Sequence, residues 1–213
     1  MKQPLSLVND MFGETESLSF EHKDLIIDDD DIKPLIYVLE DGYVRQFVTT
    51  QSGEELSLHI YKPGSIFPVV VYMAKANNRF AFQALGTVHV RPIDPDLFMQ
   101  KLVNKPELLL DLNTNLSKGL LGLTIRLEHT LFSNAYMKVA SLIDYFVNSF
   151  GDGKSGFIEL AVPFTHQDLA NWLGLARETV SRQIEQLQAD GIVKYNGNTL
   201  LVNKQKLSIL MER

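Results

Sequence analysis

The chain has 213 residues, with 20 Lys and Arg against 26 Asp and Glu, 45% hydrophobic residues and no cysteine. The absence of cysteine excludes disulfides, thiolate nucleophiles, and zinc sites or iron–sulfur clusters held by cysteine. The first twenty residues lack the apolar segment and the cleavage site of a secretory signal, and no apolar run is long enough to span a membrane. We therefore expect a cytoplasmic protein with one large domain or two small ones and no membrane partner.

The formal net charge of −6 is unevenly distributed along the chain. Residues 1–132 carry 12 basic and 18 acidic side chains, whereas residues 133–213 carry eight of each. An acidic protein does not attract nucleic acid through its overall field. Any DNA binding therefore requires a local face on the neutral C-terminal part.

The segment from Leu25 to Ile93 has the pattern of short strands separated by turns. Two β-rich runs, Leu35–Leu39 and Tyr43–Thr49, flank Asp41-Gly42, and an Asp-Gly pair in this setting predicts a hairpin. Further strands are predicted at residues 56–60, where Leu56, Leu58 and Ile60 alternate with polar residues, and at Phe67–Tyr72, Phe80–Leu85 and Thr87–Ile93. Many short strands at near-regular spacing predict a compact sandwich or barrel.

A stripe of leucines follows Pro95 at helical spacing. Its members are Leu109, Leu112, Leu116, Leu120, Leu123 and Leu127. They predict an amphipathic helix of about 25 residues, which is either a buried core helix or one that pairs with its copy, and its unusual length favours a homodimer. Gly119 and Gly122 on it either permit close helix approach or are tolerated small residues. Ser133-Asn134 then indicates a break and an N-cap for a second helix over residues 135–149.

Residues 163–203 carry the strongest local pattern in the chain. Thr165 predicts the N-cap of a short helix, and Gly174 predicts its C-cap. A second helix is predicted over Arg177–Leu187, with Val180, Ile184 and Leu187 turned inward. Two short helices joined at a glycine form a helix-turn-helix unit. The β-rich runs Ile192–Tyr195 and Thr199–Val202 then flank Asn196-Gly197-Asn198 and predict a wing hairpin.

The outer face of the second predicted helix carries Arg177, Glu178, Ser181 and Arg182 near its N-terminus. That end of such a helix contacts base edges in the major groove of double-stranded DNA. Arginine can donate two hydrogen bonds to guanine, and glutamate can accept one from cytosine. Lys194 on the predicted wing is placed to reach a phosphate.

These motifs, in this order over almost the whole chain, resemble the cyclic-AMP receptor / fumarate-nitrate regulator (CRP/FNR) family, most specifically in the R-E-T-V-S-R segment that begins at Arg177. The resemblance implies an α+β fold: a cyclic-nucleotide-binding-like β-roll (a jelly roll) over residues 1–100, a dimerisation helix over residues 101–132, and a winged helix-turn-helix over residues 133–213. It also implies a homodimeric transcription regulator with RNA polymerase as a partner.

The resemblance further assigns roles to single residues. Arg177, Glu178 and Arg182 match base-reading positions, and Glu178, Ser181 and Arg182 match the set used by regulators of the fumarate-nitrate type. The half-site is therefore TGTGA-like or TTGAT-like. Thr165, His166 and Gln167 fall where the family touches phosphates.

The N-terminal half departs from the family's cyclic-nucleotide motif. Pro68-Val69-Val70 stands where a G-E-L segment holds the ribose, and Phe80 follows Arg79 where a serine helps to hold the cyclic phosphate. The departures disfavour cyclic AMP and leave a candidate effector pocket at Phe67, Val69, Arg79 and Phe80, filled either by the protein's own side chains or by an unknown effector.

Other sensor chemistries and function classes are also disfavoured. His22, His59, His89 and His129 are scattered singly, so no haem ligand stands out, and Asp28–Asp31 has the character of a solvated loop, so no metal site is predicted. An enzyme, such as a cupin-type barrel, needs clustered metal ligands or a nucleophile with its base. Two alternatives remain open: a regulator that binds DNA without any ligand, and a winged helix that docks another protein.

Overall fold

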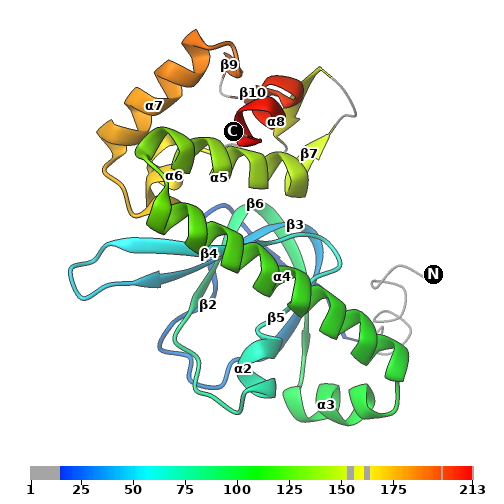
Figure 1. Ribbon diagram of the computed structural model, residues 1–213. Helices are drawn as coiled ribbons and strands as arrows, with labels where there is room; N and C mark the ends of the chain where they lie inside the picture. Colours follow the sequence, from blue (N-terminus) through cyan, green and yellow to red (C-terminus); the bar gives the residue numbers. More distant parts are fainter. Residues whose placement is uncertain (1–14, 153–155, 161–163, 198, 213) are drawn as a thin grey trace. The chain divides into compact units, whose positions relative to one another are not determined.

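The computed structural model describes residues 15–152, 156–160, 164–197 and 199–212 (Figure 1). The chain divides into two compact units, residues 1–118 and 119–213. The long helix α4 (Pro106–Phe132) contributes its first half to one unit and its second half to the other.

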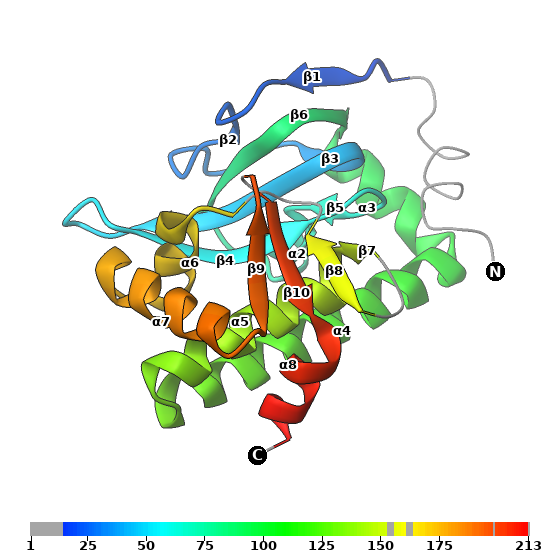
Figure 2. The same cartoon turned by 90° about the horizontal axis from the view of Figure 1, so that it is seen from above.

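The first unit is built on an antiparallel β-sheet. Its two long strands, β3 (Ile36–Thr49) and β6 (Ala81–Ile93), pair with each other along most of their length. The shorter strands β4 (Glu55–Tyr61) and β5 (Ile66–Phe67) pair with β3, whereas β1 (Leu18–Phe20) and β2 (Leu25–Ile27) pair with β6. The order β1-β6-β3-β4 can be followed in Figure 2.

Two hydrophobic clusters form the core of this unit. One unites residues of β2, β3, β5 and β6, and its largest fully buried members are Phe67 and Phe82. The other joins the helices α2 (Val69–Met73) and α3 (Pro95–Val103) and the start of α4 to the ends of β3 and β6. The strands and helices of the unit are thus held together by apolar burial.

The hairpin expected at Asp41-Gly42 is absent, because β3 continues through this pair. Gly42 does adopt the positive φ of +82° that suggested a turn. Its role is instead at an irregularity in the pairing with β6, where the register shifts on both sides of Asp41. A Cβ at Gly42 would lie 2.5 Å from the carbonyl oxygen of Thr87, so the glycine permits a close approach of two strands.

The other strand predictions in this unit are wrong in detail. Residues 80–85 and 87–93 belong largely to the single strand β6, in which Gly86 (φ +87°) lies at the same shift in register and makes no turn. The apolar run after Phe67 forms the short helix α2, because Pro68 lacks the N–H group needed to extend the β5 ladder. In β4 a bulge reverses the expected alternation, so Ser57 is buried and Leu56 is exposed.

The second unit combines helices with a four-stranded antiparallel sheet. After α4 come α5 (Ala135–Phe150), β7 (Gly151–Asp152), β8 (Phe157–Leu160), α6 (His166–Leu173), α7 (Arg177–Ala189), β9 (Val193–Asn196), β10 (Thr199–Asn203) and α8 (Lys204–Met211). The sheet order is β7-β8-β10-β9. Asn134 caps α5 by accepting a hydrogen bond from the backbone N–H of Met137 at 3.0 Å, which confirms the predicted break and cap.

Aromatic packing organises the core of the second unit. The ring of Phe146 stacks on Phe164 with centroids 4.0 Å apart and meets Trp172 edge-on at 5.5 Å. The guanidinium of Arg126, from the second half of α4, lies 4.8 Å from the centroid of the Trp172 ring. Burial lowers the pKa of Arg126, and the ring face offers it a favourable electrostatic environment. The end of α4 is thereby anchored to this unit.

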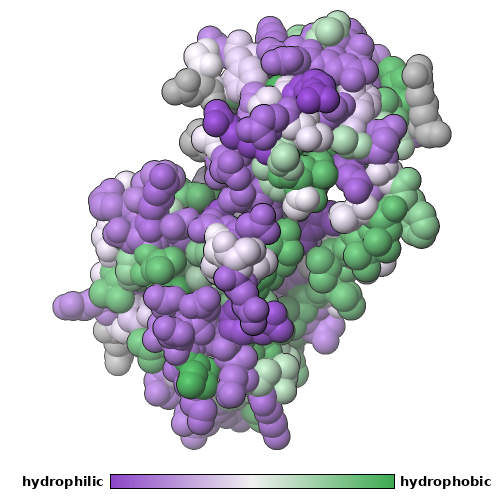
Figure 3. Space-filling model, turned by 90° about the vertical axis from the view of Figure 1, so that its left-hand side faces the viewer, coloured by the Kyte–Doolittle hydropathy of each residue, from purple (hydrophilic) through white to green (hydrophobic). Residues whose placement is uncertain are grey.

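The predicted long helix is confirmed, and its leucine stripe divides into two parts. Leu112 is buried, and Leu116 packs against the second cluster of the first unit. The other four stripe positions, Leu109, Leu120, Leu123 and Leu127, are 43–66% exposed. Figure 3 shows apolar side chains, in green, at the surface among polar ones. A Cβ added at Gly119 or Gly122 would meet nothing within 4 Å in this chain.

The α+β class predicted from the sequence is confirmed: a β-roll precedes a long helix and a winged helix-turn-helix.

Candidate nucleic-acid interface

The first helix of the helix-turn-helix, α6, is closed at both ends as the sequence predicts. The Thr165 side chain accepts a hydrogen bond from the backbone N–H of Asp168 at 3.1 Å, and the Asp168 carboxylate accepts one from the backbone N–H of Thr165 at 2.8 Å. This reciprocal capping box satisfies two N–H groups that the helix leaves unpaired. At the other end, Gly174 is in the left-handed conformation, with φ 60° and ψ 36°.

The second helix, α7, has one buried face and one exposed face. Val180, Ile184 and Leu187 are fully buried, as predicted. On the opposite face Arg177, Glu178 and Arg182 are exposed and Ser181 is half-buried. Together with Glu185, these four residues line one open depression. The structure therefore brings the four predicted base-reading side chains together.

Glu185 at this depression was missed by sequence reasoning. Its spacing from Glu178 and Arg182 is seven and three residues, which places it on the same helical face. Helical periodicity could therefore have identified Glu185 from the sequence as a member of this face.

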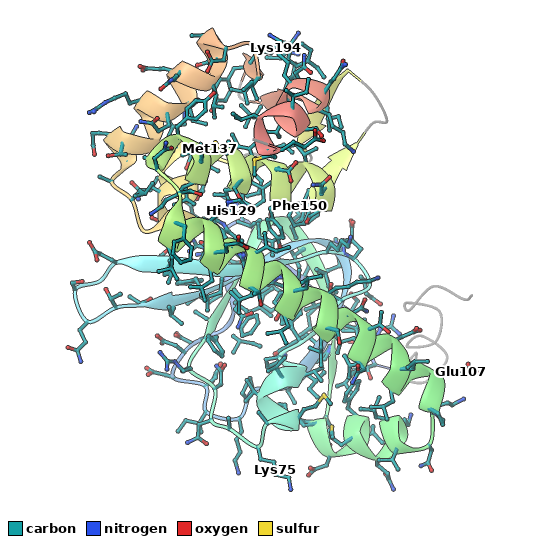
Figure 4. All side chains as sticks on the ribbon, in the orientation of Figure 1. Lys75, Glu107, His129, Met137, Phe150 and Lys194 are labelled. Carbon is teal, nitrogen blue, oxygen red and sulfur yellow. The ribbon has the colours of Figure 1, made fainter. Side chains whose placement is uncertain are left out.

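The side chains predicted to touch phosphates lie at the start of α6 and on the wing. Gln167 and Lys194 are exposed, and the Gln167 amide donates to Asn171 at 2.7 Å. The Lys194 ammonium lies 4.0 Å from the centroid of the Phe157 ring (Figure 4). The Thr165 hydroxyl is engaged in the capping box. Gln167 and Lys194 are therefore exposed for contact with a partner, whereas Thr165 also stabilises the start of α6.

His166 differs from the other predicted phosphate contacts because both of its ring nitrogens are engaged within the protein. Nδ1 lies 2.8 Å from the Ser181 hydroxyl on α7, and Nε2 lies 3.1 Å from the Tyr195 hydroxyl on β9. Burial raises the pKa of Tyr195 above its ordinary value. Sequence reasoning missed Tyr195, since nothing local in the wing marks it as a partner of α6.

The four residues of the candidate effector pocket do not converge. Phe67 and Val69 are buried in two different core clusters, Phe80 packs against the cluster of Phe67, and Arg79 is exposed. The ring of Phe67 lies between those of its neighbours, at centroid distances of 5.1 Å from Tyr61, 5.2 Å from Phe82 and 5.8 Å from Tyr37. These four aromatic side chains, which we call the aromatic cluster, fill the space between the strands.

Within the described part of the chain, no group of three or more His, Cys, Asp and Glu residues is arranged to hold a metal ion. Asp28–Asp31 form an exposed turn closed by a hydrogen bond from the Asp31 N–H to the Asp28 carbonyl. None of the helices in these described residues is long and apolar enough to cross a membrane.

Comparison with known proteins identifies the class. Residues 17–105 match the family model of the cyclic nucleotide-binding domain, and residues 138–209 match that of the Crp-like helix-turn-helix domain. A fold of the cyclic-nucleotide-binding type joined to a DNA-binding helix-turn-helix defines the chain as a transcription regulator of two domains.

Individual relatives agree with this class. Transcriptional regulator SdrP of Thermus thermophilus is 28% identical over 180 residues, which cover 83% of this chain and 83% of that protein. A solved structure of a CRP/FNR-family transcriptional regulator from Thermus thermophilus superposes with a TM-score of 0.73 at 23% identity, over 93% of this chain and 99% of that one. A mutant of CooA from Carboxydothermus hydrogenoformans gives a TM-score of 0.81 at 21% identity, over 98% and 95%. The chain belongs to the CRP/FNR family of transcription regulators.

Proposed function

We propose that this regulator is a homodimer that reads a near-palindromic DNA site in the major groove. The observation that carries the proposal is the depression on α7, where Arg177, Glu178, Ser181 and Arg182 lie together on the exposed face. The two guanidinium groups suit guanine O6 and N7, and the Glu178 carboxylate suits the amino group of cytosine. Such a helix enters the groove with its N-terminal residues toward the bases.

Phosphate contacts on either side would fix the register of the helix in the groove. Gln167 and Lys194 are exposed on α6 and β9, the two elements next to α7 in the winged helix-turn-helix. Thr165 holds the start of α6, whose backbone N–H groups also favour an anion. His166, which the family resemblance places in this set, lies between the two helices and the wing.

The exposed leucines of α4 support the dimer. Leu109, Leu120, Leu123 and Leu127 lie on one stripe, and pairing with a second copy would remove them from water. A two-fold dimer presents two copies of α7 to successive major grooves, and the site is then a near-palindrome with TGTGA-like or TTGAT-like halves. In this proposal the protein acts in the cytoplasm, has RNA polymerase as a partner and catalyses no reaction.

The aromatic cluster favours a regulator that is competent to bind DNA without a ligand. Its rings pack on one another in the core between the strands, and Arg79 is exposed and outside that core. A ligand can shift a conformational equilibrium only through different affinity for two states. Control by an effector other than a cyclic nucleotide is the alternative form of the same proposal.

The test is selection of bound sequences from a randomised DNA duplex library by the purified, ligand-free protein, with sedimentation to measure the oligomeric state. We expect a dimer and a near-palindromic motif. A folded dimer that recovers a motif only when cell extract is added would show that an effector is required. Binding without any motif, or no binding in either condition, would contradict the proposal and favour a winged helix that docks protein.

A further inference from the structure

Three polar side chains from three elements form a continuous hydrogen-bonded chain behind the candidate interface. Tyr195 on β9 contacts His166 at the start of α6 at 3.1 Å, and His166 contacts Ser181 on α7 at 2.8 Å. All three are half-buried. We call this chain the Tyr195–His166–Ser181 relay. Ser181 is its only member that lines the depression on α7.

The donors and acceptors in the relay follow from the chemistry of its groups. A phenol carries a more acidic proton than an aliphatic hydroxyl, so Tyr195 is the stronger donor to the imidazole. The raised pKa of Tyr195 keeps that proton on the phenol. When Nε2 of His166 accepts it, the ring proton resides on Nδ1, because a neutral imidazole has one donor and one acceptor nitrogen.

The position of the ring proton on His166 determines how the Ser181 hydroxyl can act. Nδ1–H donates to the Ser181 oxygen, so one lone pair of the hydroxyl is occupied and its own proton is directed elsewhere. An unconstrained serine can either donate to a base or accept from one, and it therefore discriminates poorly. A serine held from behind as an acceptor keeps its proton free to point toward the depression, which favours donation to a base over acceptance from one.

We propose that His166 and Tyr195 are positioning residues that fix Ser181 as a hydrogen-bond donor. The base opposite Ser181 is then guanine, thymine or adenine, whose O6, O4 or N7 accepts in the major groove, and not cytosine, which presents an amino donor there. His166 thereby contributes to specificity through α7 rather than through a phosphate. This inference rests on the proposed DNA-reading function and goes beyond it by making a wing residue determine one base preference.

The test uses the full-length protein and four variants. Tyr195→Phe removes the first donor, His166→Phe removes both ring nitrogens, and Ser181→Ala marks the base position that the serine reads. Tyr136→Phe is the matched control, since it deletes a phenol hydroxyl bonded to Asp190 at 2.6 Å in the same unit. Library selection gives the motif of each protein, and competition binding measures the ratio of Kd values for the four bases at each position.

We expect Ser181→Ala to flatten one position per half-site that is guanine, thymine or adenine in the wild-type motif. Tyr195→Phe and His166→Phe should lower discrimination at that same position by about 3- to 10-fold, the contribution of one hydrogen bond, and leave the positions read by arginine unchanged. Tyr136→Phe should keep the wild-type motif. Ratios of Kd do not depend on the active fraction, so partial misfolding of a variant does not imitate this result.

Three results would overturn the inference. The relay variants could keep wild-type discrimination at the Ser181 position, all positions could weaken alike, or the wild type could select cytosine there. Each of these leaves a wild-type motif intact and so spares the proposed function. A wild-type protein that selects no motif overturns both.

Discussion

The two units of this chain both pack aromatic rings in their cores, but the residues predicted to bind a partner are placed differently in each. In the first unit the aromatic rings point inward and pack on one another, so that the interior of the β-roll is occupied by Tyr37, Tyr61, Phe67 and Phe82. In the second unit the helices bury their apolar faces and leave a set of hydrogen-bonding groups on one exposed face. Among the described residues, the predicted pocket residues of the first unit lie mainly in its core, whereas the predicted reading residues of the second unit lie at its surface.

Arginine shows the same contrast. Arg45 in β3 is almost fully buried, pairs with Glu55 and lies 4.2 Å from the centroid of the Phe47 ring. Its charge is compensated inside the unit, as a buried ion requires. Arg177 and Arg182 are exposed at the depression on α7, where their donors can reach a partner. Burial and compensation therefore distinguish a structural arginine from a candidate reading residue.

The largest effect should come from opening the interior of the first unit. Phe82→Ala removes a fully buried ring that contacts Phe67 and Tyr61, and we expect a loss of about 3–5 kcal/mol in the free energy of unfolding. Chemical denaturation followed by circular dichroism measures this loss. The fluorescence of Trp172, the single tryptophan, reports the second unit in the same samples.

Leu56→Ala is the control for Phe82→Ala, because Leu56 is an exposed residue of the same sheet. Its effect should stay within about 0.5 kcal/mol. A loss below about 1 kcal/mol in Phe82→Ala would mean that the ring is loosely packed, and the interior would again be a candidate ligand cavity.

A smaller effect, on binding, is expected at the exposed face of the second unit. Arg182→Ala should weaken binding to the selected site by about 1–3 kcal/mol and relax the preference at one base pair, because a bidentate contact to guanine is lost. Fluorescence anisotropy with the selected duplex and its single-base variants measures both quantities.

Lys194→Ala supplies the matched comparison for Arg182→Ala. It removes a positive charge that we assign to a phosphate, so it should weaken binding to every sequence alike and reduce the salt slope by about 1. An equal loss on selected and scrambled duplexes in Arg182→Ala would remove Arg182 from the base-reading set.

The sequence was most informative where local interactions determine the conformation. Thr165, Gly174 and the spacing of Val180, Ile184 and Leu187 each act within one or two helical turns, and the structure confirms them. The candidate reading face followed from the same periodicity. Its base contacts stay a prediction.

The same local reasoning failed in the β-roll, because its strands pair with segments that are distant in the sequence. Asp41-Gly42 has the composition of a hairpin turn, but β3 pairs with residues about forty-five positions later and stays continuous through this pair. The packing that places Phe67 and Val69 in separate clusters also depends on distant elements. The contact between His166 and Tyr195 spans 29 residues and has no local signature.

The smallest effect concerns a polar group that the second unit partly buries. Burial raises the pKa of Asp144 on α5 above its ordinary value, although Lys204, His129 and a hydrogen bond from Asn148 act in the opposite direction. Between the ordinary and the raised pKa the folded protein binds a proton that the unfolded chain does not. Stability from this group therefore rises as the pH falls through that window.

Asp144→Asn removes this titration and keeps an oxygen that can accept the hydrogen bond from Asn148. We expect the variant to be slightly more stable than the wild type at pH 7, and the difference to shrink as the pH approaches 4. Denaturation followed by Trp172 fluorescence at the two pH values measures the difference for this unit. A wild type that is the more stable protein at pH 7 would show that the attraction to Lys204 and His129 outweighs the loss of hydration. Partial burial of charge would then be as well compensated in the second unit as it is around Arg45 in the first.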